Sequence, residues 1–149
     1  MKFREINPPI YFYLSIILLT ILHFFLPIER ILIFPWNLLG LFPLAGGIYL
    51  NLAADQLFKK HGTTVKPQEK SSFMITSSVF RISRNPMYLG MVLIIAGLVL
   101  IFGSLSPWLV VILFALFLDW VFICFEEKNL QKIFGEQWAD YCKKVRRWV

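Results

Sequence analysis

The chain has 149 residues, of which 58% are hydrophobic and 17% aromatic, and its mean hydropathy is +0.67. Soluble domains are about 45–50% apolar. Because the excess here lies in blocks, the composition excludes an ordinary soluble domain and predicts one polytopic membrane domain, residues 1–149. The net charge is +6, but the basic residues flank the apolar blocks instead of lining one face. That placement is typical of loops near anionic lipid and argues against nucleic-acid binding.

The apolar blocks predict an all-α fold with four transmembrane helices. A bilayer core of about 30 Å requires about 20 helical residues, with a range of about 17 to 25. Four segments meet or approach this length: residues 8–28, 31–58, 86–102 and 107–125. The second contains Pro35 and Pro43, where we expect a tilt or kink. Short connections predict two helical hairpins, residues 1–58 and 86–125, joined by a polar loop, residues 59–85.

The distribution of Lys and Arg predicts the orientation. Of the 15 basic residues, 14 lie at the N-terminus, in the 59–85 loop or in the tail after residue 125, and only Arg30 lies on the other side. Cytoplasmic loops carry the excess of Lys and Arg, so we expect both termini and the 59–85 loop in the cytoplasm. The chain is then an integral protein of a bacterial or archaeal cytoplasmic membrane, with the lipid bilayer as its surroundings.

The tail, residues 126–149, has a different pattern. Apolar side chains recur in it at helical spacing with charged residues between them. This predicts an amphipathic cytoplasmic helical segment that lies on the membrane or over the helix ends, with a break near Gly135. The apolar positions are Leu130, Ile133, Phe134, Trp138, Tyr141, Val145 and Trp148.

The sequence RNPMYLG opens the third apolar segment. Pro86 fits the first helical position, where its missing N–H costs nothing, and Asn85 is then a candidate N-cap. A capped helix with an interfacial Arg84 would explain this much. It leaves Tyr88 and Gly90 unexplained, beside a helix N-terminus that suits an anion.

Three acids lie in or just after the fourth segment. Glu126 and Glu127 follow it with no polar spacer, and a glutamate at an apolar boundary is costly without a partner. The pair either marks the membrane surface or serves a site. Adjacent helical side chains point about 100° apart, so one can face a pocket while the other pairs with a basic tail residue. Asp119 lies seven residues before Glu126, so we expect both on one face, with either a site role or a structural hydrogen bond for Asp119.

The remaining polar and sulfur-containing residues carry weaker signals. His23 stands alone in the first segment, where a packing role is more common than a ligand role. Cys124 and Cys142 show no paired spacing, so neither a disulfide nor a metal site is predicted. The sequence contains none of the usual nucleotide-binding or hydrolase signatures of soluble enzymes.

Together the stretches GTTVKP, FRISRNPMYLG, the glutamate pair and FGEQWADYCKKVRRW resemble the isoprenylcysteine carboxyl methyltransferase and phospholipid methyltransferase family of integral-membrane enzymes. The resemblance covers residues 57–148. It implies methyl transfer from S-adenosyl-L-methionine, with S-adenosyl-L-homocysteine as product, in a cytoplasm-facing pocket made by the last two membrane helices and the tail. The cofactor-binding residues that it implies are Arg84, Asn85, Pro86, Tyr88, Gly90, Glu126, Glu127, Trp138 and Tyr141.

The acceptor of the methyl group is left open as a lipophilic or small thiol, amine or carboxylate. Glu126, Glu127 and Asp119 are the candidate catalytic residues, because a carboxylate can take a proton from a thiol or amine. Eukaryotic carboxyl methyltransferases of the family carry an arginine shortly before the glutamate pair, whereas residues 121–125 here include no basic residue. Two alternatives remain, namely a non-catalytic membrane scaffold and a membrane oxidoreductase of the related sterol-reductase type. The oligomeric state is not predicted.

Overall fold

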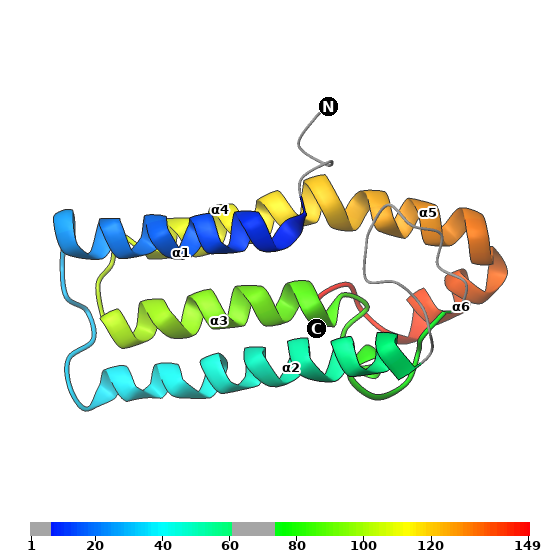
Figure 1. Ribbon diagram of the computed structural model, residues 1–149, viewed down its shortest axis with the longest axis horizontal. Coiled ribbons are helices and arrows are strands. Elements are labelled where there is room, and N and C mark those ends of the chain that lie inside the picture. Colours follow the sequence, from blue (N-terminus) through cyan, green and yellow to red (C-terminus); the bar gives the residue numbers. More distant parts are fainter. Residues whose placement is uncertain (1–6, 61–73) are drawn as a thin grey trace.

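The computed structural model describes residues 7–60 and 74–149, whose arrangement is drawn in Figure 1. The elements within these ranges are helices, as the composition predicted. The GTTVKP stretch and four of the counted basic residues (Lys2, Arg4, Lys66 and Lys70) lie outside the described residues. The elements are α1 (Pro8–Phe25), η2 (Trp36–Gly40), α2 (Leu41–Lys60), η3 (Ser78–Arg81), α3 (Pro86–Phe102), α4 (Trp108–Leu118), η4 (Asp119–Ile123), α5 (Cys124–Phe134) and α6 (Glu136–Lys144).

Among the described residues, three helices are long and apolar enough to cross a bilayer: Pro8–Phe25, Trp36–Lys60 and Trp108–Phe134. The remaining apolar helix, Pro86–Phe102, has 17 residues and is shorter than these. The prediction of an all-helical membrane protein is therefore confirmed, and the number of four spans stays a prediction.

The two prolines of the second span lie where a helix tolerates them. Pro35 precedes η2, and Pro43 lies in the first turn of α2, where a backbone N–H has no intrahelical partner to lose. A 3-10 turn, η2, lies directly ahead of α2, and the tilt or kink expected at these prolines stays a prediction.

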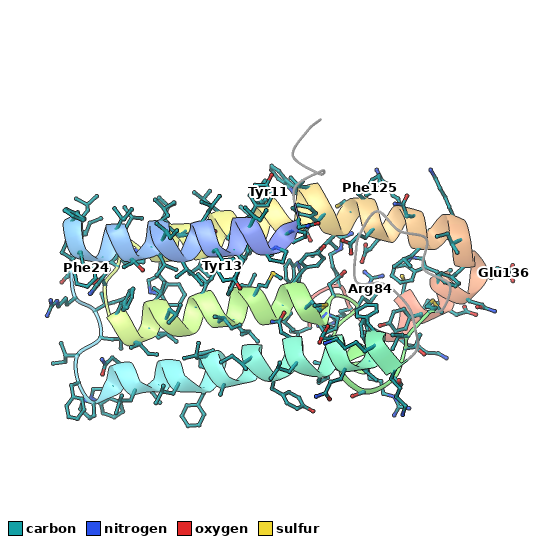
Figure 2. All side chains as sticks on the ribbon, viewed as in Figure 1. Tyr11, Tyr13, Phe24, Arg84, Phe125 and Glu136 are labelled. Atoms are coloured by element: carbon teal, nitrogen blue, oxygen red, sulfur yellow. The ribbon has the colours of Figure 1, made fainter. Side chains whose placement is uncertain are left out.

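Helix α3 lies between α2 on one side and α1 with α4 on the other (Figure 1). It shares the main apolar core with α1 and α4, in which Leu19, Ile95, Val99 and Leu118 are completely buried. Many large apolar side chains of α1 and α2 are instead exposed and project away from the bundle (Figure 2). Such extensive apolar surface is typical of a membrane interaction.

Glycines allow α2 and α3 to approach closely. Gly47 of α2 faces Gly90 of α3, and seven residues away Gly40 of η2 faces Gly97 of α3. A Cβ on Gly97 would lie 2.7 Å from the carbonyl oxygen of Gly40, which is well inside contact distance. Small residues at regular spacing are a common means of bringing membrane helices together. This contact fixes the position of α3, and with it that of the RNPMYLG motif.

The two short connections meet at the end of the bundle remote from that motif. The backbone N–H of Ile31 donates to the carbonyl of Gly103 at 2.8 Å. His23 Nδ1 lies 2.6 Å from Ser104 Oγ, and the His23 ring stacks on Phe102 with the centroids 4.5 Å apart. His23 is thus a packing residue with a polar partner, the role that the sequence favoured.

The fourth apolar helix continues beyond the predicted boundary after residue 125. Helix α4 passes into η4, a π-helical turn, and then into α5, so that one long rod extends past the ends of α1 and α3 (Figure 1). The rod ends at Gly135, whose φ of +52° suits glycine, and α6 turns back toward the bundle. The predicted break near Gly135 is confirmed. Residues 145–149, which we call the C-terminal strap, follow α6.

We expect replacement of Gly47 by alanine to destabilise the protein by about 1–3 kcal/mol, because overpacking a close contact forces the backbones apart. The added Cβ would lie 2.5 Å from the carbonyl oxygen of Gly90. The neighbouring Gly46 is the matched control, since a Cβ there meets nothing within 4 Å and alanine is favoured over glycine in a helix by about 1 kcal/mol. Thermal unfolding in detergent measures both variants, and equal stability would contradict the need for close approach.

Candidate functional site

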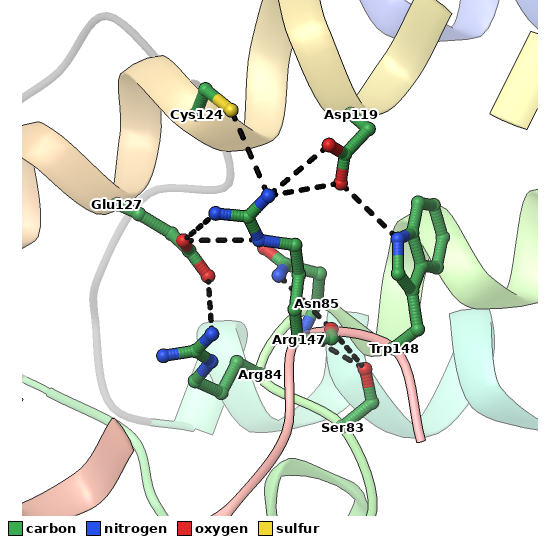
Figure 3. Close-up of polar contacts among 8 residues, drawn as sticks. All are labelled: Ser83, Arg84, Asn85, Asp119, Cys124, Glu127, Arg147 and Trp148. Atoms are coloured by element: carbon green, nitrogen blue, oxygen red, sulfur yellow. Dashed lines mark hydrogen bonds and ion pairs between the residues drawn. The ribbon is translucent and has the colours of Figure 1, made fainter. Parts of the chain in front are cut away.

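Three consecutive residues before α3 bind the C-terminal strap. The backbone N–H of Arg84 donates to the carbonyl of Arg146 at 3.0 Å. The Oγ of Ser83 and the Nδ2 of Asn85 donate to the next carbonyl, that of Arg147, at 3.0 and 3.2 Å. Figure 3 shows the strap crossing the start of α3 at this point. The strap is therefore part of the same local structure as the RNPMYLG motif.

The start of α3 follows the prediction only in part. Pro86 lies in the first turn of the helix, and Asn85 occupies the N-cap position. The predicted side-chain cap is wrong, however, because Asn85 makes no capping hydrogen bond and its amide is bonded to the strap. Ser83 closes the turn instead, since its Oγ accepts a hydrogen bond from the Asn85 backbone N–H at 3.1 Å.

Tyr88 and Glu126 are in direct contact. The Tyr88 hydroxyl, in the first turn of α3, donates to Oε1 of Glu126, in the first turn of α5. The two residues are 38 positions apart. They meet because α3 runs away from this end of the bundle and α4 returns to it (Figure 1). The structure thus brings the RNPMYLG motif and the glutamate pair together.

Glu127 binds two guanidinium groups. Nη2 of Arg84 lies 3.2 Å from Oε1, and Nη2 and Nε of Arg147 lie 2.7 and 3.2 Å from Oε2 (Figure 3). The Arg84 guanidinium also lies over the Trp138 ring, 5.7 Å from its centroid, a distance typical of a cation–π contact. Only 12% of the Glu127 side chain is exposed, so this carboxylate requires its counter-charges. The hydrogen bond to Glu127 also raises the pKa of Arg147 above its ordinary value.

Asp119 shares a face of the last helical rod with Glu127. The sequence had predicted that it shares a face with Glu126. Its two oxygens accept from Nη1 of Arg147 at 3.1 and 3.3 Å, and Trp148 Nε1 donates to Oδ1 at 3.2 Å. The predicted alignment with Glu126 assumed a continuous α-helix. The π-helical turn at Asp119–Ile123 adds a residue to one turn. Side chains eight residues apart, instead of seven, therefore share the face.

Two of the predicted cofactor-binding residues have other contacts. The Tyr141 hydroxyl donates to the backbone carbonyl of Phe80 at 2.6 Å, and burial raises the pKa of Tyr141, so it remains a donor. Gly90 packs against α2, where an added Cβ would collide with Asn51 and Gly47. Both positions lie outside the ion pairs of Arg84, Asp119, Glu127 and Arg147, which we call the charged cluster, and their contact with a cofactor stays a prediction. Arg84 itself lies just before the start of α3 and pairs with Glu127 of α5 (Figure 2).

An open groove of about 420 Å³ lies beside this cluster. It runs along one face of α5 and reaches the strap. Glu127 and Arg147 belong to both the groove and the charged cluster, so the cluster is accessible from outside the bundle. The residues that line it are Cys124, Glu127, Lys128, Gln131, Lys132 and Arg147.

Sequence reasoning expected one of the two glutamates to pair with a basic residue of the tail, and Glu127 does pair with Arg147. It did not identify which basic residue this is, and it counted Trp148 only as an apolar position. One signal was present, because three acids at an apolar boundary require cations and the 121–125 stretch supplies none. That imbalance points to cations from elsewhere in the chain, although it does not select Arg147 over the other basic tail residues.

Comparison with known proteins identifies the family. A sequence model described as phospholipid methyltransferase matches residues 36–137, which is more than half of the chain. The chain belongs to the phospholipid methyltransferase family. An uncharacterised protein of Haemophilus influenzae is 40% identical over 63 residues, which make up 42% of this chain and all of that protein. No solved structure matches the chain.

Membership of the phospholipid methyltransferase family makes this a membrane protein of a methyltransferase class. The matched residues include Arg84, Tyr88 and the glutamate pair, so the contacts that α3 and the turn before it make with α5 join two parts of the family's own region. Arg147 and Trp148 lie beyond the matched residues.

We expect Asp119→Asn to lower stability by about 1–3 kcal/mol, because it weakens charge-assisted hydrogen bonds from Arg147 and Trp148. Thermal unfolding in detergent measures the loss. Asp140→Asn is the control, since Asp140 pairs with Lys143 on the exposed face of α6, and it should leave the unfolding temperature unchanged. If both variants unfold at the parent temperature, Asp119 does not hold the strap.

Proposed function

We propose that this protein transfers a methyl group from S-adenosyl-L-methionine to a lipophilic or small acceptor at the cytoplasmic end of the bundle. The acceptor carries a thiol, an amine or a carboxylate. One observation carries the proposal: Tyr88 contacts Glu126 beside the Arg84–Glu127 ion pair, in a chain of the phospholipid methyltransferase family. The RNPMYLG motif therefore supplies a cation, Arg84, to the same place at which the glutamate pair supplies its carboxylates.

The cluster contains unsatisfied polar atoms that fit this cofactor. Within the described residues, two of its buried side-chain atoms lack a hydrogen-bond partner, Nε of Arg84 and Oε1 of Glu127. The Glu127 oxygen is near Arg84 Nη2, but outside the direction of a hydrogen bond. Buried polar groups nearly always form hydrogen bonds. Nε of Arg84 therefore requires an acceptor, and Oε1 of Glu127 requires a donor. A methionine carboxylate supplies the acceptor, and the cofactor's ammonium and ribose hydroxyls supply donors.

Each of these residues has a role in the proposed complex. Arg84 would hold the carboxylate of the cofactor, because a guanidinium is the best partner for that group. Glu126 and Glu127 would accept from the ammonium or the ribose hydroxyls. Tyr88 and Trp138 would offer aromatic surface near the positive charge.

When bound, S-adenosyl-L-methionine supplies a methyl group that moves to the lone pair of the acceptor as its carbon–sulfur bond breaks, which leaves S-adenosyl-L-homocysteine as a neutral thioether. The protein mainly supplies in-line approach and exclusion of water. A thiol or amine acceptor also loses a proton, and we assign its capture to Glu126. Asp119 and Glu127 are less suited because Arg147 already neutralises them. A carboxylate acceptor needs no such proton transfer.

We also propose that Pro86–Phe102 crosses the membrane, which gives four spans within one domain. Its 17 residues extend about 25 Å, and the turns at its two ends can cover the remaining thickness. Both termini and residues 59–85 would then be cytoplasmic, in agreement with the excess of Lys and Arg on that side. The groove beside α5 would open to the cytoplasm, from which the cofactor arrives.

We expect Glu126→Gln to weaken binding of S-adenosyl-L-homocysteine by about ten- to more than a hundredfold. The reason is that a charged hydrogen bond contributes about 1.5–3 kcal/mol. Isothermal titration calorimetry in detergent measures the dissociation constant. Glu136→Gln is the matched control, because Glu136 is exposed at the start of α6, and it should bind as the parent does.

The same titration separates the competing functions. A methyltransferase binds S-adenosyl-L-homocysteine and not NADPH, an oxidoreductase of the sterol-reductase type binds NADPH, and a scaffold binds neither. Binding of S-adenosyl-L-homocysteine that is unchanged in Glu126→Gln would remove Glu126 from the site. Incubation of the purified protein with labelled S-adenosyl-L-methionine and a membrane extract would identify the acceptor.

The topology is tested by single cysteines at Lys59 and Leu105, with Cys124 and Cys142 replaced by serine. Both chosen positions are exposed, at opposite ends of the bundle. In intact cells, an impermeant thiol reagent should label the cysteine at position 105 and not that at position 59. Labelling of position 59 from outside would reverse the proposed orientation.

A further inference from the structure

Arg147 differs from the other basic residues of the tail in what surrounds it. Its side chain is 34% exposed, whereas that of Lys143 on α6 is 75% exposed. All three of its guanidinium nitrogens are used on two acids. Nε and Nη2 donate to Glu127, and Nη1 donates to Asp119. A lipid-facing or solvated charge would not need this set of partners.

The backbone and neighbours of Arg147 are also fixed. Its carbonyl accepts from both Ser83 and Asn85. The next residue, Trp148, donates to Asp119, so the acid that holds Nη1 is itself restrained. The guanidinium therefore stands at a defined place between α5 and the start of α3 (Figure 3).

In this arrangement the two carboxylate oxygens of Glu127 have different partners. Arg147 takes Oε2 with two hydrogen bonds, of 2.7 and 3.2 Å. Oε1 is thereby turned toward Arg84, buried and without a hydrogen bond among the described residues. Without Arg147, the Glu127 carboxylate could rotate and bind Arg84 with both oxygens, which would use up the donors of Arg84 as well.

We infer that Arg147 is a positioning residue of the cofactor site, which clamps Oε2 of Glu127 and so presents Oε1, together with Nε of Arg84, to the cofactor. The inference rests on the proposed function, because it assigns Glu127 and Arg84 to the cofactor. It adds a residue that lies outside the region matched by the family. In this inference Arg147 acts through Glu127.

The test is a double-mutant cycle in the full-length protein, read out as the dissociation constant of S-adenosyl-L-homocysteine by calorimetry in detergent. We expect Arg147→Gln to weaken binding at least about tenfold, the effect of one charge-assisted hydrogen bond. In a Glu127→Gln background the same change should weaken binding less than about twofold, because the residue through which Arg147 acts is already altered. Arg81→Gln is the control, since Arg81 is exposed on η3 and should bind as the parent does.

A merely structural Arg147 would give a different result. Binding would then fall by the same factor in the parent and in the Glu127→Gln background, and that outcome overturns the inference. Parent-like binding by a folded Arg147→Gln variant overturns it too, while the proposed function stands. If the parent does not bind S-adenosyl-L-homocysteine, the proposed function and this inference both fail.

Loss of Arg147 leaves two carboxylates facing one another, so Arg147→Gln alone is at risk of unfolding. In that case the cycle is run in an Asp119→Asn background, which removes one of the two charges. Each variant is compared with Asp119→Asn, and thermal unfolding confirms that all are folded. We expect Arg147→Gln to weaken binding by the same factors as above. Equal factors with Glu127 and with Gln at position 127 would again overturn the inference.

Discussion

The charge of Glu127, at the end of an apolar bundle, is neutralised by two guanidinium groups, and the rest of the site depends on this ion pairing. Removing one partner from a buried ion pair can cost about 3–5 kcal/mol. The two cations that satisfy Glu127 come from the turn before α3 and from the strap, far apart in the sequence. The ion pairs of Glu127 therefore join three segments: α5, the turn before α3, and the strap.

The two adjacent glutamates have different partners for a geometric reason. Neighbouring residues on a helix point about 100° apart, so Glu126 reaches Tyr88 while Glu127 reaches the guanidinium groups. The phenol leaves the charge of Glu126 uncompensated, whereas two guanidinium groups neutralise that of Glu127. The two glutamates, adjacent in the sequence, thus have different surroundings: a phenol beside Glu126 and two guanidinium groups beside Glu127.

Sequence reasoning predicted the features that depend on local pattern. The apolar blocks indicated the helices, Gly135 indicated the break in the tail, and a helical hairpin was sufficient to place Tyr88 near the glutamates. What it missed depends on contacts between distant segments. Asn85 has the chemistry of a cap, but its amide is used by the strap. Nothing in the residue types of Asp119–Ile123 signals a π-helical turn, which is why Asp119 was placed on the wrong face.

The pairing of glycines was also beyond the sequence, for a related reason. Gly90 was assigned to the cofactor because of its place in a motif, which stays a prediction, and the structure adds that it packs against Gly47. Finding this contact requires the position of α2 along its axis relative to α3. The residue pattern of a single helix does not contain that information. The family's motif therefore includes at least one position whose contact here is with a neighbouring helix.

The length of the last rod sets the depth of the charged cluster. Trp108–Phe134 has 27 residues, or about 40 Å of helix, against a hydrocarbon core of about 30 Å. Counted from Trp108, the core would end near Glu127, and the rest of α5 would stand in water. Under the proposed function, an acceptor with an apolar tail would then reach Glu126 by lateral diffusion within one leaflet, and a soluble cofactor would arrive from the aqueous phase. Acceptor supply would be governed by its number per unit area of membrane, so dilution of the bilayer with inert lipid would slow turnover even when the total amounts of protein and acceptor stay constant.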